Sequence, residues 1–112
     1  MSFTLLEQRD DQSAFDQEIL RHEVVKKLRQ ALKRHLTNQA VWVYGSILVP
    51  NKFSIRSDID IALVQPPRHV SIYLLQSLLT EATGHEVDLC FLEETRLRNK
   101  IESHGERWIE SA

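Results

Sequence analysis

The sequence of 112 residues is poor in cysteine and contains no long apolar run. Its single cysteine is Cys90, so no disulfide can form within the chain, and a disulfide-stapled scaffold is excluded. No apolar stretch approaches the roughly 20 residues that a membrane-spanning helix needs. The first residues, MSFTLLEQRDD, turn acidic where a secretory signal would be hydrophobic. We therefore expect a cytoplasmic protein that does not enter the membrane.

An excess of positive charge is also missing. The formal net charge is −2, so composition provides no global attraction to nucleic acid, and direct nucleic-acid binding is not expected. Basic residues gather between Lys26 and His35, but no aromatic residues interleave with them, which favours a solvated helix face. The histidines show no HExxH spacing of the kind used by zinc hydrolases. We assign them to the surface or to helix ends: His22, His35, His69, His85 and His104.

Repeats, linkers and low-complexity tracts are absent from the sequence, so its length predicts a single domain over residues 1–112. Residues 1–12 show no sustained hydrophobic period, and we expect a frayed N-terminal extension there. Ser13 is the predicted cap of a long helix. Apolar residues at three-to-four spacing predict one buried stripe along this helix. They are Phe15, Ile19, Leu20, Val24, Leu28, Ala31, Leu32 and Leu36.

The rest of the chain predicts strands that alternate with shorter helices. One short helix is expected between a cap at Ser71 and a left-handed stop at Gly84, and another over Thr95–Ser103. This order favours one sheet covered by helices. Apolar and β-branched runs predict strands over 41–44, 58–64 and 86–92, with a small edge strand over 107–110.

The middle of the chain combines a turn suited to phosphate with a strand that carries carboxylates. Gly45 and Ser46 end the first strand, where glycine lets backbone amides approach an anion and serine adds a hydroxyl. Residues 47–49 are expected to form a short helical turn whose amino end would reinforce this site. Asp58 and Asp60 alternate with isoleucines, so both carboxylates point to the same face of the next strand.

A third carboxylate, Asp88, lies on the third predicted strand. If this strand pairs with the second, about 4.8 Å away, Asp88 converges on Asp58 and Asp60. Hard oxygen ligands suit Mg²⁺ or Mn²⁺, and two ions roughly 3.5–4 Å apart can clamp the oxygens of a displacement at phosphorus. The pattern therefore predicts a two-metal site for a nucleoside triphosphate, in which Lys52 or Arg56 neutralises phosphate charge.

Each of these residues has a role in such a mechanism and also a structural alternative. Asp58 and Asp60 would bridge the metals, whereas Asp88 would bind the metal beside the attacking hydroxyl and accept its proton. Taken singly, a Gly-Ser pair is usually a turn, and an aspartate on a one-sided sheet often faces solvent. The order of the features favours the metal–nucleotide site, because one mechanism requires all of them.

These motifs resemble the minimal nucleotidyltransferases of the DNA polymerase beta superfamily. In that family a Gly-Ser after the first strand is followed by Asp-x-Asp and by a later Asp, which here are Gly45, Ser46, Asp58, Asp60 and Asp88. The resemblance implies an α/β (α+β) fold with a nucleotidyltransferase-like mixed sheet of three to four strands flanked by helices. It also implies two divalent metal ions and transfer of a nucleoside monophosphate with release of pyrophosphate.

In bacteria and archaea, small proteins of this family often work with an all-helical partner of the HEPN type. The resemblance, which extends from about Glu23 to Ile109, implies an antitoxin-like component that transfers AMP to a tyrosine hydroxyl of a partner encoded nearby. The alternative is a non-catalytic nucleotide-binding module that masks such a toxin-like partner. The base, the acceptor and a homo- or hetero-oligomeric state stay open.

Two features depart from the pattern of the family. Eleven residues separate Ser46 from Asp58, one more than is usual in the family. The residues 47–50, Ile-Leu-Val-Pro, stand where small, glycine and arginine residues are common after Gly-Ser. We therefore expect contacts to the triphosphate to be weaker, or to run through Lys52 and Arg56.

Overall fold

The computed structural model describes the backbone of residues 2–111 and the side chains of residues 14–111. In this part of the chain, four strands form a sheet in the order β3-β2-β1-β4. The sheet is mixed, because β2 and β3 are parallel whereas β1 is antiparallel to both β2 and β4. The predicted α/β fold class is therefore confirmed. The elements are α1 (Ser2–His35), β1 (Ala40–Tyr44), η1 (Ser46–Leu48), β2 (Ile59–Leu63), α2 (Ile72–Thr83), β3 (Val87–Phe91), α3 (Arg98–His104) and β4 (Glu106–Ile109).

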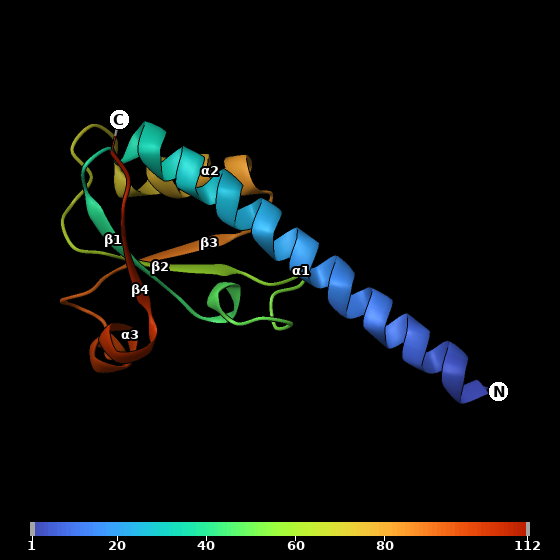
Figure 1. Cartoon of the computed structure of the whole chain (residues 1–112). Coiled ribbons are helices and arrows are strands. Elements are labelled where there is room, and N and C mark those ends of the chain that lie inside the picture. Colours follow the sequence, from blue (N-terminus) through green and yellow to red (C-terminus); the bar gives the residue numbers. More distant parts are fainter. Residues whose placement is uncertain (1, 112) are drawn as a thin grey trace.

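The helix α1 is longer than the sequence predicts. It begins at Ser2 and has 34 residues, so the prediction of a frayed extension followed by a cap at Ser13 is wrong. A serine cap stabilises a helix start by only about 1 kcal/mol, and the preceding residues, which include Leu6, Glu7 and Gln8, are good helix formers. The N-terminal half of α1 extends away from the sheet, and the molecule measures 58 × 28 × 22 Å (Figure 1).

The buried stripe of α1 begins later than its apolar pattern predicts. Phe15 and Ile19 are 62% and 48% exposed, because this part of the helix extends beyond the sheet. Leu20 packs partly against the core, and burial is complete from Val24 onward. Among the described residues, no helix is both long enough and apolar enough to cross a membrane.

The two faces of the sheet are covered differently. The helices α1 and α2 pack against the face that carries Val43, Ile61 and Val87, and together they form the main core. On the other face, Ile101 of α3 packs with Ala62 in a smaller cluster. Because the cover on this second face is small, polar side chains of the strands can reach solvent there.

The predicted ends of α2 are confirmed, whereas α3 begins at Arg98, three residues after the predicted start at Thr95. Ser71 accepts a hydrogen bond from the amide of Leu74 and caps α2, and Gly84 ends this helix with φ +76°. The turn η1 follows Gly45 directly, one residue earlier than expected. The predicted edge strand is β4, which pairs with β1.

His85 directly follows the Gly84 cap of α2, which agrees with the assignment to a helix end, but it does not lie on the surface. Its exposed fraction is 7%, and its Nδ1 lies 2.8 Å from the carbonyl oxygen of Ser57. The ring packs on Phe53, with 4.7 Å between the ring centroids. His85 is therefore part of the structure that fixes the connection leading into β2.

Candidate functional site

Strand pairing brings the predicted site residues to one end of the sheet. Asp60 of β2 and Asp88 of β3 are direct partners in the parallel register, which confirms the predicted pairing of these strands. Tyr44 of β1 lies opposite Asp60 in the antiparallel register, so Gly45 follows at the same end. Since side chains alternate along a strand, both carboxylates lie on the face that α3 covers only partly.

The carboxylates act on one another electrostatically. Asp58 lies one residue before β2 and is exposed, whereas Asp60 is half-buried. Burial raises the pKa of Asp60, and the negative charges of Asp88 and Asp58 raise it further. Within residues 14–111, none of the three carboxylates belongs to an ion pair with a basic side chain. Their repulsion is therefore not compensated by the described side chains.

Gly45 joins the turn to the carboxylates. Its backbone has φ +85° and ψ −155°, a conformation that is essentially restricted to glycine. A Cβ at this position would lie 2.5 Å from the Oδ2 atom of Asp60, which is too close for a real contact. The Gly45-Ser46 turn and the carboxylate of Asp60 therefore belong to the same site.

The donor set fits a divalent cation that is shared with a substrate. Within residues 14–111, no three His, Cys, Asp or Glu side chains gather closely enough to form a complete metal-binding cluster. Asp60 and Asp88 nevertheless present hard oxygen ligands side by side, with Asp58 close enough to raise the pKa of Asp60. Mg²⁺ usually binds one or two carboxylates and completes its coordination with water and substrate phosphates. The side chains fit such an ion better than one enclosed by protein alone.

A cavity of about 370 Å³ opens beside Gly45 and Asp60, between η1 and α3. Lys100 and His104 are its basic lining residues, four positions apart on α3 and so on the same side of that helix. Sequence reasoning missed both of them. The only available signal was two basic residues at helical spacing near the end of the chain, and this does not reveal what the helix faces. The remaining walls are formed by Tyr44, Leu48, Val49, Leu97 and Ile101.

Lys52 and Arg56 are not among the residues that line this cavity. Both are exposed on the connection between η1 and β2. Part of this connection is bound to α1, because the amide of Asn51 donates a hydrogen bond to Glu18 Oε1 at 2.7 Å. A role of Lys52 or Arg56 in phosphate binding stays a prediction.

Tyr44 lies at the wall of the cavity with its hydroxyl 3.5 Å from Cys90 Sγ. Burial raises the pKa of Tyr44, and Cys90, Asp60 and Asp88 raise it further. The phenol therefore stays protonated at neutral pH. Cys90 is half-buried and packs with Tyr44 and Trp42 against the smaller cluster.

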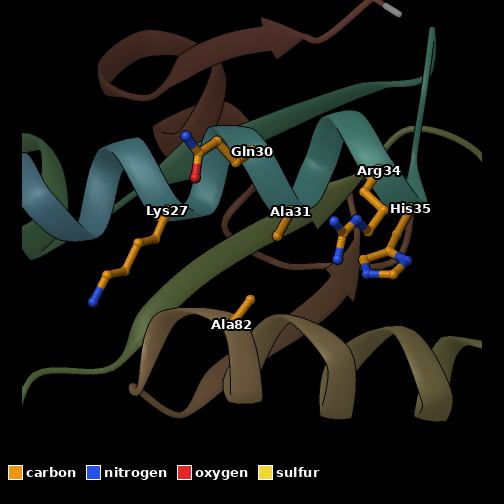
Figure 2. Close-up of a pocket in the computed structure, with 6 residues that line it drawn as sticks. All are labelled: Lys27, Gln30, Ala31, Arg34, His35 and Ala82. Atoms are coloured by element: carbon orange, nitrogen blue, oxygen red, sulfur yellow. The ribbon is translucent and has the colours of Figure 1, made fainter.

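A second hollow, of about 340 Å³, lies between α1 and α2. Figure 2 shows the side chains of Lys27, Arg34 and His35 on the side of α1 that faces α2, around the small residues Ala31 and Ala82. The helices α1 and α2 cover the sheet face opposite to that of the carboxylates. This basic groove is therefore separate from the candidate site.

The chain matches one known protein family over most of its length. Residues 26–111, more than half of its length, match the model of the family "Polymerase beta, Nucleotidyltransferase". The chain belongs to this nucleotidyltransferase family. The resemblance carried by the Gly-Ser turn and the Asp-x-Asp motif is thereby confirmed, and the nucleotidyltransferase fold agrees with the mixed sheet.

One solved structure similar to this nucleotidyltransferase is described as "Crystal structure of the toxin-antitoxin with AMP-PNP". The TM-score is 0.56 and the identity 22%, over 75% of this chain and 72% of that chain. At this identity the likeness shows a shared fold. A comparison with curated proteins finds no match.

Proposed function

We propose that this nucleotidyltransferase transfers AMP from ATP to a hydroxyl group of a partner protein. The observation that carries the proposal is the direct pairing of Asp60 with Asp88 next to the Gly45-Ser46 turn. Asp58, Asp60 and Asp88 would hold one or two Mg²⁺ or Mn²⁺ ions together with the substrate phosphates. Such ions, when bound, supply positive charge that stabilises the phosphoryl group during transfer.

The residues of the chain then have separate tasks. The backbone amides and hydroxyl of the Gly45-Ser46 turn bind the β- and γ-phosphates. Lys100, which lines the adjoining cavity, places positive charge beside the triphosphate. Asp88 accepts the proton of the attacking hydroxyl. A bond forms between that oxygen and the α-phosphorus, the bond from the α-phosphorus to the bridging oxygen breaks, and pyrophosphate leaves.

Similarity of fold supports the identity of the nucleotide and the kind of partner. The solved structure of similar fold is a toxin-antitoxin with AMP-PNP, which supports an adenine nucleotide and a two-component system for this chain. We therefore propose an antitoxin-like role, with a small all-helical HEPN-type protein encoded nearby as the acceptor. In this role the transferred AMP would inactivate the partner.

A labelling assay tests the proposal. The purified chain, Mg²⁺ and α-labelled ATP are combined with the protein encoded by the neighbouring gene, and we expect label to appear on that protein. Asp60→Ala and Asp88→Ala should reduce labelling to background, because each removes a predicted metal ligand. Glu81→Ala, which removes an exposed carboxylate of α2, is the matched control and should label normally. Full labelling by both aspartate variants would contradict the mechanism.

The second candidate function is a nucleotide-binding module that masks the partner without chemistry. It is favoured by Leu48 and Val49, which place apolar surface beside the turn. If Asp60→Ala and Asp88→Ala still neutralise the partner fully in cells, the masking function is correct and the catalytic one is wrong.

A further inference from the structure

The segment after Gly45 is held at two points by the helix α1. Arg21 Nη1 donates a hydrogen bond to the carbonyl oxygen of Ile47 at 3.2 Å. The amide of Asn51 donates to Glu18 Oε1 at 2.7 Å. Glu18 and Arg21 also pair with each other, with 3.0 Å between Arg21 Nη2 and Glu18 Oε2. We call this pair, with its two contacts to the segment, the Glu18–Arg21 clamp.

The clamp differs from an ordinary solvated ion pair. The side chains of Arg21 and Glu18 are 17% and 25% exposed. The hydrogen bond from Arg21 lowers the pKa of Glu18, and the bond from the Asn51 amide lowers it further, so Glu18 is ionised at neutral pH. Hydrogen bonds with an ionised partner are roughly twice as strong as neutral ones. Both contacts to the segment are of this kind.

The segment that the clamp holds forms part of the candidate site. It begins with η1, directly after Gly45, and it supplies Leu48 and Val49 to the cavity wall. It ends at Asn51, whose φ of +66° is unusual for a residue other than glycine. A change in the orientation of this segment would therefore displace both the Gly45-Ser46 turn and the cavity wall.

The two side chains of the clamp lie outside the part of the chain that matches the family model. Glu18 and Arg21 precede residues 26–111, which match the family model. The helix α1 supplies polar contacts at Ile47 and Asn51 that hold the backbone of the segment after Gly45.

We propose that Glu18 and Arg21 are positioning residues of the nucleotide site. They fix the orientation of residues 46–51, and through this backbone they place the turn amides and the wall formed by Leu48 and Val49. Neither side chain lines the cavity, so their effect on the site runs through the backbone of the segment. The consequence for nucleotide binding rests on the proposed function, whereas the consequence for the backbone does not.

Hydrogen exchange measures the effect on the backbone directly. Arg21→Ala and Glu18→Ala should each accelerate exchange at the amides of Leu48 and Asn51, by about tenfold or more for a loss of roughly 1.4 kcal/mol of local stability. Amides of β2 should keep their protection, because the change is local. Lys26→Ala removes an exposed charge from the same helix and should change nothing. Unchanged exchange in both variants would overturn the proposal.

Nucleotide binding supplies the second readout. The dissociation constant for AMP-PNP with Mg²⁺ should rise several-fold in Arg21→Ala and Glu18→Ala, and Arg21→Lys should recover only part of the loss, because lysine lacks the planar fork. Glu18→Gln keeps an oxygen that accepts from the Asn51 amide but removes the negative charge. It replaces Glu18→Ala in both measurements if the alanine variant unfolds. Accelerated exchange with unchanged affinity would overturn the positioning role. If the wild-type chain binds no AMP-PNP, the proposed function fails, while the exchange data still decide whether the clamp holds the segment.

Discussion

Gly45 is the residue at which the turn and the carboxylates meet, and Gly45→Ala tests this contact. The new Cβ would lie 2.5 Å from Asp60 Oδ2 and would push that carboxylate away from its position. The backbone at φ +85° would add strain of about 1–3 kcal/mol. We expect a lower midpoint of urea unfolding together with loss of AMP-PNP binding.

Gly84→Ala is the matched control for this prediction. Gly84 has φ +76°, but no atom from elsewhere in the described structure lies within 4 Å of the position that its Cβ would occupy. This variant should therefore lose stability while nucleotide binding is preserved. Equal loss of binding in both variants would mean that Gly45 acts through general stability and not through Asp60.

The charge of Asp60 predicts a pH-dependent penalty in the absence of metal. Burial, Asp88 and Asp58 raise the pKa of Asp60 in the folded chain. Asp60 therefore loses its proton more readily in the unfolded chain than in the folded chain. At a pH above the pKa of Asp60 in the folded chain, its negative charge lowers the free energy of unfolding. This loss of stability disappears below the pKa of Asp60 in the unfolded chain. In EDTA, Asp60→Asn should therefore be more stable than the wild type at neutral pH, with a difference that shrinks toward about pH 4.

Urea unfolding of both proteins at the two pH values measures this difference. Mg²⁺ should stabilise the wild type and have little effect on Asp60→Asn, because the variant lacks one carboxylate ligand. A wild type that is the more stable protein at neutral pH in EDTA would show that Asp60 already has a compensating partner.

At the scale of elements, Arg29 connects the helix α1 to the edge strand β4. Its guanidinium lies 3.7 Å from the centroid of the Trp108 ring, and its Nη1 lies 2.6 Å from Glu110 Oε1. Arg29→Ala should destabilise the fold by about 1–2 kcal/mol, since a cation–π contact and an ion pair are lost together. The free energy of unfolding of Arg29→Lys should lie between those of the wild type and Arg29→Ala, because lysine keeps the charge but lacks the flat surface that stacks on Trp108.

Arg98 of α3 serves as the control for Arg29. It pairs with Glu102 within α3, and the two side chains are 52% and 42% exposed. Exposed pairs at this spacing contribute only about 0.3–0.5 kcal/mol, so Arg98→Ala should hardly change the urea midpoint. Similar losses in Arg29→Ala and Arg98→Ala would contradict the connecting role of Arg29.

The sequence predicts most elements because their signals are local. The alternating run around Asp60 predicts β2, and the serine and glycine that flank α2 mark its ends. The start of α1 was missed, because a cap at Ser13 competes with helix formers on both sides. The basic wall of the cavity was missed for another reason. Lys100 lies at the site only because α3 packs across β1. This contact joins segments that are far apart in the chain, so the residues around Lys100 do not predict it.

For the whole molecule, the long axis arises from the part of α1 that extends past the sheet (Figure 1). Among residues 14–35, burial of the helix is complete only from Val24. Deletion of residues 1–13 leaves this buried part in place, and we expect it to change the free energy of unfolding by less than about 1 kcal/mol. Urea unfolding followed by circular dichroism measures this change.

A longer deletion supplies the contrast. Removal of residues 1–22 also removes Glu18 and Arg21, and it should weaken AMP-PNP binding as the single clamp variants do. A large loss of stability from the shorter deletion would mean that the extended part of α1 contributes to the fold beyond the contacts of residues 14–111.

The parallel pairing of β2 with β3 also has a kinetic consequence. Asp60 and Asp88 become neighbours only after the chain has passed through α2, a non-local pairing of the kind that forms slowly during folding. A cation that needs both carboxylates gains affinity only once these strands are joined. If they join after the rate-limiting step, Mg²⁺ should slow unfolding and leave the refolding rate unchanged. The unfolding limb of a chevron plot, recorded with and without Mg²⁺, would then report when this pair of strands separates.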